Sequence, residues 1–115
     1  RDRTGVVFTN ITTSSGTVNC EVTWTRLGRG MFLHVHLYPD AGQTLTVAAS
    51  WRIDLSGVSG MPTFTKDTAV GVATGNAITP GVVALYTGGT RIIYGNNALL
   101  SGANLYYVMT AFVPY

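Results

Sequence analysis

The chain has 115 residues, of which 46% are hydrophobic and 10% are charged, against about 25% charged residues in an average soluble domain. This length fits one domain, residues 1–115, with a real hydrophobic core. The net charge of +2 is scattered, whereas nucleic-acid binding needs a clustered basic surface. No apolar run reaches the roughly eighteen residues that span a bilayer. We therefore expect no nucleic-acid partner and no membrane insertion.

Three strands are predicted in the first 38 residues, at 5–12, 17–26 and 31–38. The second strand alternates polar residues with the apolar Val18, Cys20, Val22 and Trp24. Because successive strand side chains point to opposite faces, this apolar face is expected in the core. Cys20 is then a buried, inert thiol. Gly28 and Gly30 predict a tight link between the second and third strands.

The most regular pattern lies between residues 44 and 55, where apolar side chains occupy the odd positions Leu45, Val47, Ala49, Trp51, Ile53 and Leu55. A strict two-residue period predicts a strand with one buried face, so all six are expected to point inward. Turn residues precede this strand at Pro39–Gly42, and a loop with glycines and a proline follows it. A fifth strand is expected at 68–74.

Three further strands are predicted in the C-terminal part, at 82–87, 90–94 and 105–113. Gly88 and Gly89 separate the first two and accept the positive φ angles of a two-residue hairpin. Short strands at these intervals, with no comparably long segment of helical period, are typical of a sandwich. The sequence therefore predicts an all-β fold, an antiparallel two-sheet β-sandwich.

Two of the expected strands carry large side chains on both faces. At 31–38 the apolar odd positions oppose Phe32, His34, His36 and Tyr38, and at 105–113 they oppose Tyr106, Val108 and Phe112. In a two-sheet domain only one face of a strand meets the core. We therefore expect a subunit interface that includes Tyr106, Val108 and Phe112. The alternative is that a loop or the chain terminus covers the second face within one subunit.

The segment WTRLGRGMFLHVHL, from Trp24 to Leu37, resembles the strand, glycine turn and strand found in C-terminal domains of bacteriophage tail fibres and tailspikes. The stretch LSGVSGMP at 55–62 and the closing strand that ends in Tyr115 are also similar to that family. The resemblance implies a jelly-roll or C1q-like sandwich that associates as a homotrimer. It also implies the C-terminal part of a longer protein, made in the host cytoplasm and carried on the tail or capsid surface of the virion.

His34 and His36 are the pair with the most suggestive chemistry. They project from one face of a strand, and the threefold symmetry of a trimer would gather six imidazoles, a set that suits a transition metal. The family resemblance implies such axial sites in narrow, needle-like tips, whereas this chain reads as a globular sandwich. We therefore expect an exposed or interface-packed histidine pair and no cofactor, with the axial metal site as the alternative.

Catalytic patterns are sparse. A Ser-His-Asp triad would have to use one of two mid-strand histidines, and no nucleophile-elbow motif presents a serine. Glycosidase chemistry needs two carboxylates roughly 5 to 10 Å apart, whereas Asp40, Asp54 and Asp67 are expected as separate surface acids. We therefore expect that the protein is not an enzyme.

Binding a carbohydrate or a host surface requires exposed aromatic rings beside polar groups. The candidates near predicted loops are Tyr38, Asp40, Tyr86, Arg91, Tyr94, Asn96 and Asn97. The leading hypothesis is a noncatalytic, trimeric tail-fibre or tailspike module that recognises a glycan or protein of the host surface. The alternatives are a structural module for trimerisation or capsid decoration and, third, a small carbohydrate-active enzyme.

Overall fold

The computed structural model describes residues 5–64, 69–75, 82–88, 91–96, 98–99 and 102–114, and for the strands at 69–75 and 82–88 it describes the backbone. The strands are β1 (Val7–Thr13), β2 (Asn19–Leu27), β3 (Gly30–Tyr38), β4 (Thr44–Asp54), β5 (Ala69–Gly75), β6 (Val82–Gly88), β7 (Ile92–Tyr94), β8 (Gly102–Ala103) and β9 (Tyr107–Pro114). The eight predicted strands all occur, each end within two residues of its expected place. The two-residue strand β8 was not predicted. The described part of the chain contains no helix capable of crossing a membrane.

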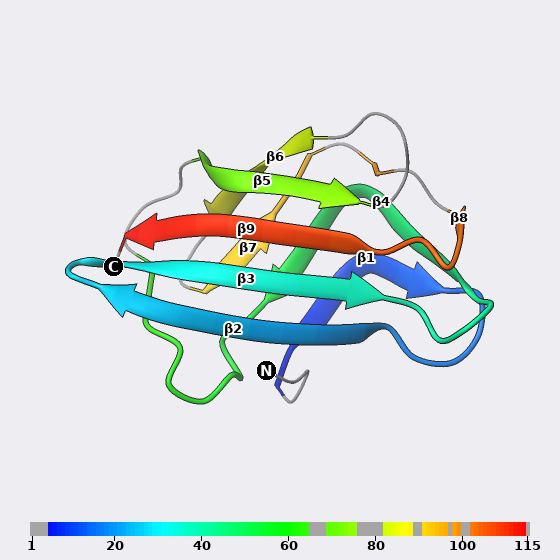
Figure 1. Cartoon of the computed structure of the whole chain (residues 1–115), viewed down its shortest axis with the longest axis horizontal. Coiled ribbons are helices and arrows are strands. Elements are labelled where there is room, and N and C mark those ends of the chain that lie inside the picture. Colours follow the sequence, from blue (N-terminus) through cyan, green and yellow to red (C-terminus); the bar gives the residue numbers. More distant parts are fainter. Residues whose placement is uncertain are drawn as a thin grey trace.

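The strands form two layers that pack face to face (Figure 1). One layer has the order β1-β4-β7-β6 and the other the order β5-β9-β3-β2, and the pairing of β5 with β6 joins them along one side. Every pairing between the described strands is antiparallel. The expected all-β, antiparallel two-sheet sandwich is therefore confirmed. The order of the strands within the layers was not predicted from the sequence and comes from the structure.

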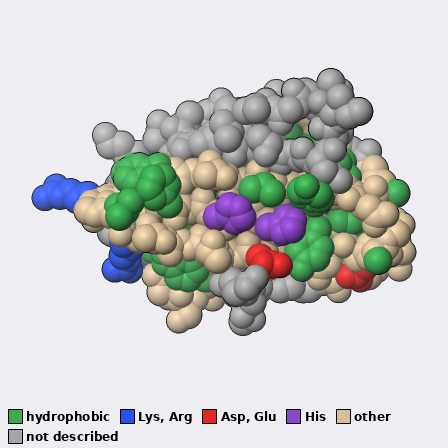
Figure 2. All heavy atoms as spheres, in the orientation of Figure 1, with side chains coloured by type: hydrophobic (Ala, Val, Ile, Leu, Met, Phe, Trp, Pro, Cys, Tyr) green, Lys and Arg blue, Asp and Glu red, His purple; other side chains and the backbone are tan. Residues whose placement is uncertain are grey.

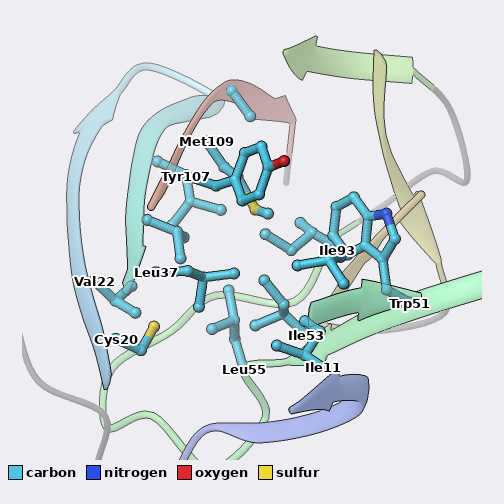
Figure 3. Packing of buried hydrophobic residues seen from close by; sticks show 14 of the residues in the cluster. Ile11, Cys20, Val22, Leu37, Trp51, Ile53, Leu55, Ile93, Tyr107 and Met109 are labelled. Carbon is cyan, nitrogen blue, oxygen red and sulfur yellow. The ribbon is translucent and has the colours of Figure 1, made fainter. Parts of the chain in front are cut away.

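The inward sides of the two layers enclose one hydrophobic cluster (Figure 3). Its fully buried members include Leu33, Val35 and Leu37 of β3 and Leu45, Trp51 and Ile53 of β4. Trp51 and the thiol of Cys20 are buried as expected. Trp24 was also expected in the core, and it lies half-buried at the margin of the cluster. There it sits near Gly60 of the loop that follows β4.

A bulge interrupts the regular pattern of β4. Thr9 pairs with Arg52 and Ile11 pairs with Val47, so β4 has three more residues than β1 between these two pairs. Asn10 and Ser50 both have positive φ angles, and the Asn10 side-chain amide donates hydrogen bonds to the carbonyls of Ala49 (3.0 Å) and Ser50 (3.3 Å). The prediction that Ala49 points inward is wrong, because the bulge turns this residue out to solvent.

The turns before and after β3 each contain a glycine with a positive φ angle. Leu27 pairs with Gly30, so Gly28 and Arg29 form the expected tight link from β2, with Gly28 at a φ of +60°. After β3, the amide of Gln43 donates to the carbonyl of Asp40 (3.0 Å), and Gly42 supplies a φ of +79°. The predicted turn at Gly88–Gly89 includes a residue outside the described ones, although β6 and β7 do pair as antiparallel neighbours.

Candidate functional site

The outward side of β2, β3 and β9, which we call the outer face, brings together the second faces of the two-sided strands. The strand register sets its side chains in three rows, Thr25–Phe32–Phe112, Thr23–His34–Thr110 and Glu21–His36–Val108. Tyr38 continues the face along β3, and Tyr106 precedes β9. Figure 2 shows the histidine pair in the middle of this face, with hydrophobic side chains on both sides.

One end of the outer face is apolar. Phe32 and Phe112 are 50% and 45% exposed, and their ring centroids lie 5.2 Å apart in an edge-to-face arrangement. Leu27, 50% exposed, lies beside them on β2. A Cβ atom at Gly30 would collide with the Phe112 ring, so the end of this ring packs against the β3 backbone at Gly30. Leu27, Phe32 and Phe112 together form the apolar end, and exposed Arg29 lies next to it in the β2–β3 hairpin.

The other end of the outer face mixes rings with a carboxylate. The ring centroid of His36 lies 4.8 Å from that of Tyr38 and 5.3 Å from that of Tyr106, whose plane is almost perpendicular to it. The hydroxyl of Tyr38 lies 3.4 Å from Oε2 of Glu21 in a hydrogen bond, and Glu21 is the cross-strand partner of His36. Glu21, His36, Tyr38 and Tyr106 form what we call the aromatic-polar end.

The three expected interface residues are accessible to different degrees in the single chain. Tyr106 and Phe112 are 39% and 45% exposed, and Val108 is half-buried. Among the described residues, no loop therefore covers the two rings completely. Their place in a subunit interface remains a prediction.

The two histidines point outward, with His34 exposed and His36 half-buried. Among the described residues no group of three histidine, cysteine, aspartate or glutamate side chains is arranged to hold a metal ion. One chain thus supplies two imidazoles from one face of β3. An axial metal site would need the symmetry of an assembly to complete its ligand set.

The loop residues expected to bind a ligand do not form one group. Tyr38 and Asp40 lie at the end of β3, whereas Arg91, Tyr94 and Asn96 lie on or beside β7 in the other layer. The Asp40 carboxylate accepts hydrogen bonds from the Thr17 amide (3.1 Å) and the Asn19 side chain (2.9 Å). The Arg91 Nε donates to the carbonyl of Met61 (2.8 Å). Both charged groups therefore hold loops in place. The Tyr86 side chain and Asn97 lie outside the described residues.

Two of the acids considered for catalysis lie far apart. Asp40 is in the turn that leads into β4, and Asp54 is the last residue of that strand. Because a strand rises about 3.3 Å per residue, the two carboxylates are separated by far more than the roughly 10 Å that glycosidase chemistry allows. Asp67 lies outside the described residues.

Asp54 is instead engaged in a local turn. Its Oδ1 accepts hydrogen bonds from the Ser56 hydroxyl (2.5 Å) and the Ser56 amide (2.9 Å), and these bonds lower the pKa of the carboxyl, with a smaller contribution from Arg52. Since the folded-state pKa is depressed, this interaction stabilises the fold above the unfolded value of about 4. The stabilisation is lost as the pH falls through the folded-state pKa.

We expect Ser56→Ala to raise the pKa of Asp54 toward its ordinary value, because the hydroxyl is the largest cause of the depression. A carboxyl carbon NMR titration of the unmodified chain and the variant measures this directly. Identical Asp54 titration curves for the two proteins would show that the hydroxyl bond has no role.

Comparisons of the chain with protein-family models, with curated proteins and with solved structures found no match. The functional proposal therefore starts from the geometry of the outer face.

The site residues expected from the sequence do not include Leu27, Phe32 or Glu21. The available signal was the two-residue period itself, because it places Phe32 on the same face as His34 and His36.

Proposed function

We propose that the chain is a noncatalytic module of a phage tail fibre or tailspike that assembles as a homotrimer and recognises the host surface. The trimer forms through the apolar end of the outer face, and the virion carries the assembled module. The observation that supports the assembly is the exposed pair of Phe32 and Phe112, with Leu27 beside it. The resemblance to phage fibre domains in Trp24–Leu37 supports the biological role.

The apolar end has the character of an interface core. Fully burying a Phe or Leu side chain stabilises by about 1.5 to 3 kcal/mol, and each of these three side chains has about half of its surface still to bury. The two phenyl rings pack against each other, and the Phe112 ring also packs against the Gly30 backbone, so little side-chain freedom is lost when they are covered. Exposed Arg29 in the β2–β3 hairpin supplies a charged group at the edge of this surface, as is usual for the rim of an interface.

A structural module for trimerisation or capsid decoration is the second candidate. It is favoured by the use of Asp40 and Arg91 within the fold, because these were the charged groups expected to contact a ligand. The two candidates share the same assembly and differ in whether the exterior binds anything further. The carbohydrate-active enzyme has less support, since Asp40 and Asp54 belong to opposite ends of β4.

The assembly is tested by the solution mass of the unmodified chain, measured by light scattering at micromolar concentration. We expect three times the chain mass of 12.2 kDa. A monomeric mass at this concentration would remove the basis of both the receptor-binding and the structural candidates.

A further inference from the structure

We propose that the aromatic-polar end of the outer face is a carbohydrate site, in which Tyr106 stacks on a pyranose ring and Glu21 and Tyr38 bind its hydroxyl groups. This inference deepens the proposed function and rests on it for the role of the bound sugar at a host surface. Several classes of ligand bind to exposed aromatic rings, and the one that we propose for this site is a neutral saccharide.

The Tyr106 ring is both accessible and held in place. It is 39% exposed, and it meets His36 edge to face with ring centroids 5.3 Å apart. His36 is itself packed against Tyr38 at 4.8 Å. A fixed aromatic face offers apolar area to the C–H side of a sugar ring, and it loses little freedom on binding because its neighbours already restrain it.

The polar groups beside the rings suit hydroxyl groups, which both donate and accept hydrogen bonds. The Glu21 carboxylate accepts, the Tyr38 hydroxyl donates and accepts, and the two lie in contact at 3.4 Å. His36 lies directly across from Glu21 on the neighbouring strand, where facing Cβ atoms are about 4.5 to 5.5 Å apart. Acceptor and donor groups therefore lie side by side on β2 and β3, and His36 links them to the Tyr106 ring.

Other ligand classes match this set of groups less well. A phosphate or another anion would meet the Glu21 carboxylate, and like charges repel. A quaternary ammonium would be attracted to the carboxylate and the rings, but it accepts no hydrogen bond from Tyr38 or His36. A neutral saccharide uses the carboxylate, the hydroxyl and the ring face together.

Of the residues expected at a subunit interface, the proposed assembly uses Phe112 and leaves Tyr106 to the carbohydrate site, so the two surfaces can operate at the same time. Tyr106 directly precedes β9 and Phe112 lies near the end of this strand, six residues later, which corresponds to about 20 Å at the rise of an antiparallel strand. The row Thr23–His34–Thr110 lies between the two ends. Contact between chains at the apolar end thus leaves space for a sugar ring at the aromatic-polar end.

The test is a titration of the isotope-labelled chain with the methyl pyranosides of glucose, galactose, mannose and N-acetylglucosamine, followed by amide chemical shifts. We expect at least one of these sugars to bind saturably in the millimolar range, with the shifts centred on residues 21, 36, 38 and 106. Failure of all four sugars to saturate, or saturation centred elsewhere, would overturn the proposal.

Substitutions of Tyr106 and Glu21 test whether the Tyr106 ring and the Glu21 carboxylate bind the sugar. Tyr106→Ala should weaken the affinity by about tenfold, whereas Tyr106→Phe, which keeps the ring, should stay within about twofold. Glu21→Gln should also weaken binding by about tenfold, since a charge-assisted acceptor becomes a neutral one. Unchanged affinity in both Tyr106→Ala and Glu21→Gln would contradict the site even if a sugar binds.

The same experiment separates this inference from the proposed assembly. A trimeric chain that binds none of the four sugars removes the carbohydrate site and leaves the assembly intact. A monomeric chain that binds a sugar at Tyr106 removes the assembly and leaves the carbohydrate site. Phe112→Ala is the control, because it changes the apolar end and should leave the sugar affinity within about twofold.

Discussion

Trp51→Ala is expected to lower the free energy of unfolding by about 3 to 5 kcal/mol, as large-to-small substitutions of buried aromatic residues do. Trp51 is fully buried, and it lies near Ile93 in the space between the two layers (Figure 3). Its ring packs directly on the backbone at Gly95, where even a Cβ atom would collide with the indole. Since Gly95 has no side chain that could move in, truncation leaves a cavity.

One feature of the indole reduces the expected loss. Its Nε1 is buried and has no hydrogen-bond partner among the described residues, and an unpaired buried donor costs about 1 to 3 kcal/mol. Trp51→Phe removes this donor and keeps most of the ring. We therefore expect Trp51→Phe to be clearly less destabilising than Trp51→Ala.

Urea unfolding followed by far-ultraviolet circular dichroism measures the loss at a fixed chain concentration. Trp24→Ala is the matched control, because Trp24 is the same residue type but only half-buried at the margin of the core. We expect it to cost less than Trp51→Ala. Equal losses in the two variants would mean that Trp51 does not occupy the centre of the core.

Local sequence patterns were sufficient for the strands and for most of the core, because the two-residue period is a property of each strand by itself. The period placed Trp51 and Ile53 inward correctly. It failed at Ala49, where the bulge is held by the side chain of Asn10 on β1. A contact between residues 39 apart in the chain leaves no mark on the local pattern of β4.

The candidate site was less predictable, because it depends on pairing between distant strands. The sequence indicated that β3 and β9 each had a second large-residue face, but only their register brings Phe32 next to Phe112. The sequence suggests Asp40 and Arg91 as ligand-binding groups because they lie near predicted turns. Their partners, Thr17 and Met61, lie in other loops, and sequence alone does not reveal that these hydrogen bonds use the charged groups within the fold.

Phe112→Asp is expected to dissociate the assembly into single chains. The Phe112 side chain is 45% exposed in one chain, so an aspartate there can stay hydrated and the chain can keep its fold. In the assembled module the same carboxylate would be buried without a partner, which typically costs several kcal/mol per ion. A trimer would carry three such charges close together.

Thr46→Asp is the matched control for the added charge. Thr46 is exposed on β4, in the layer opposite the outer face. The Thr46→Asp variant therefore introduces an aspartate at a strand position away from the proposed interface. We expect this variant to assemble like the unmodified chain, so that any loss of assembly in Phe112→Asp belongs to the apolar end.

Sedimentation equilibrium of these two variants beside the unmodified chain tests the central claim most directly. The proposed assembly predicts a mass of 12.2 kDa for folded Phe112→Asp and three times that mass for Thr46→Asp and for the unmodified chain. Circular dichroism of the same samples establishes that each variant is folded. One common mass for all three folded proteins would contradict an interface at the apolar end.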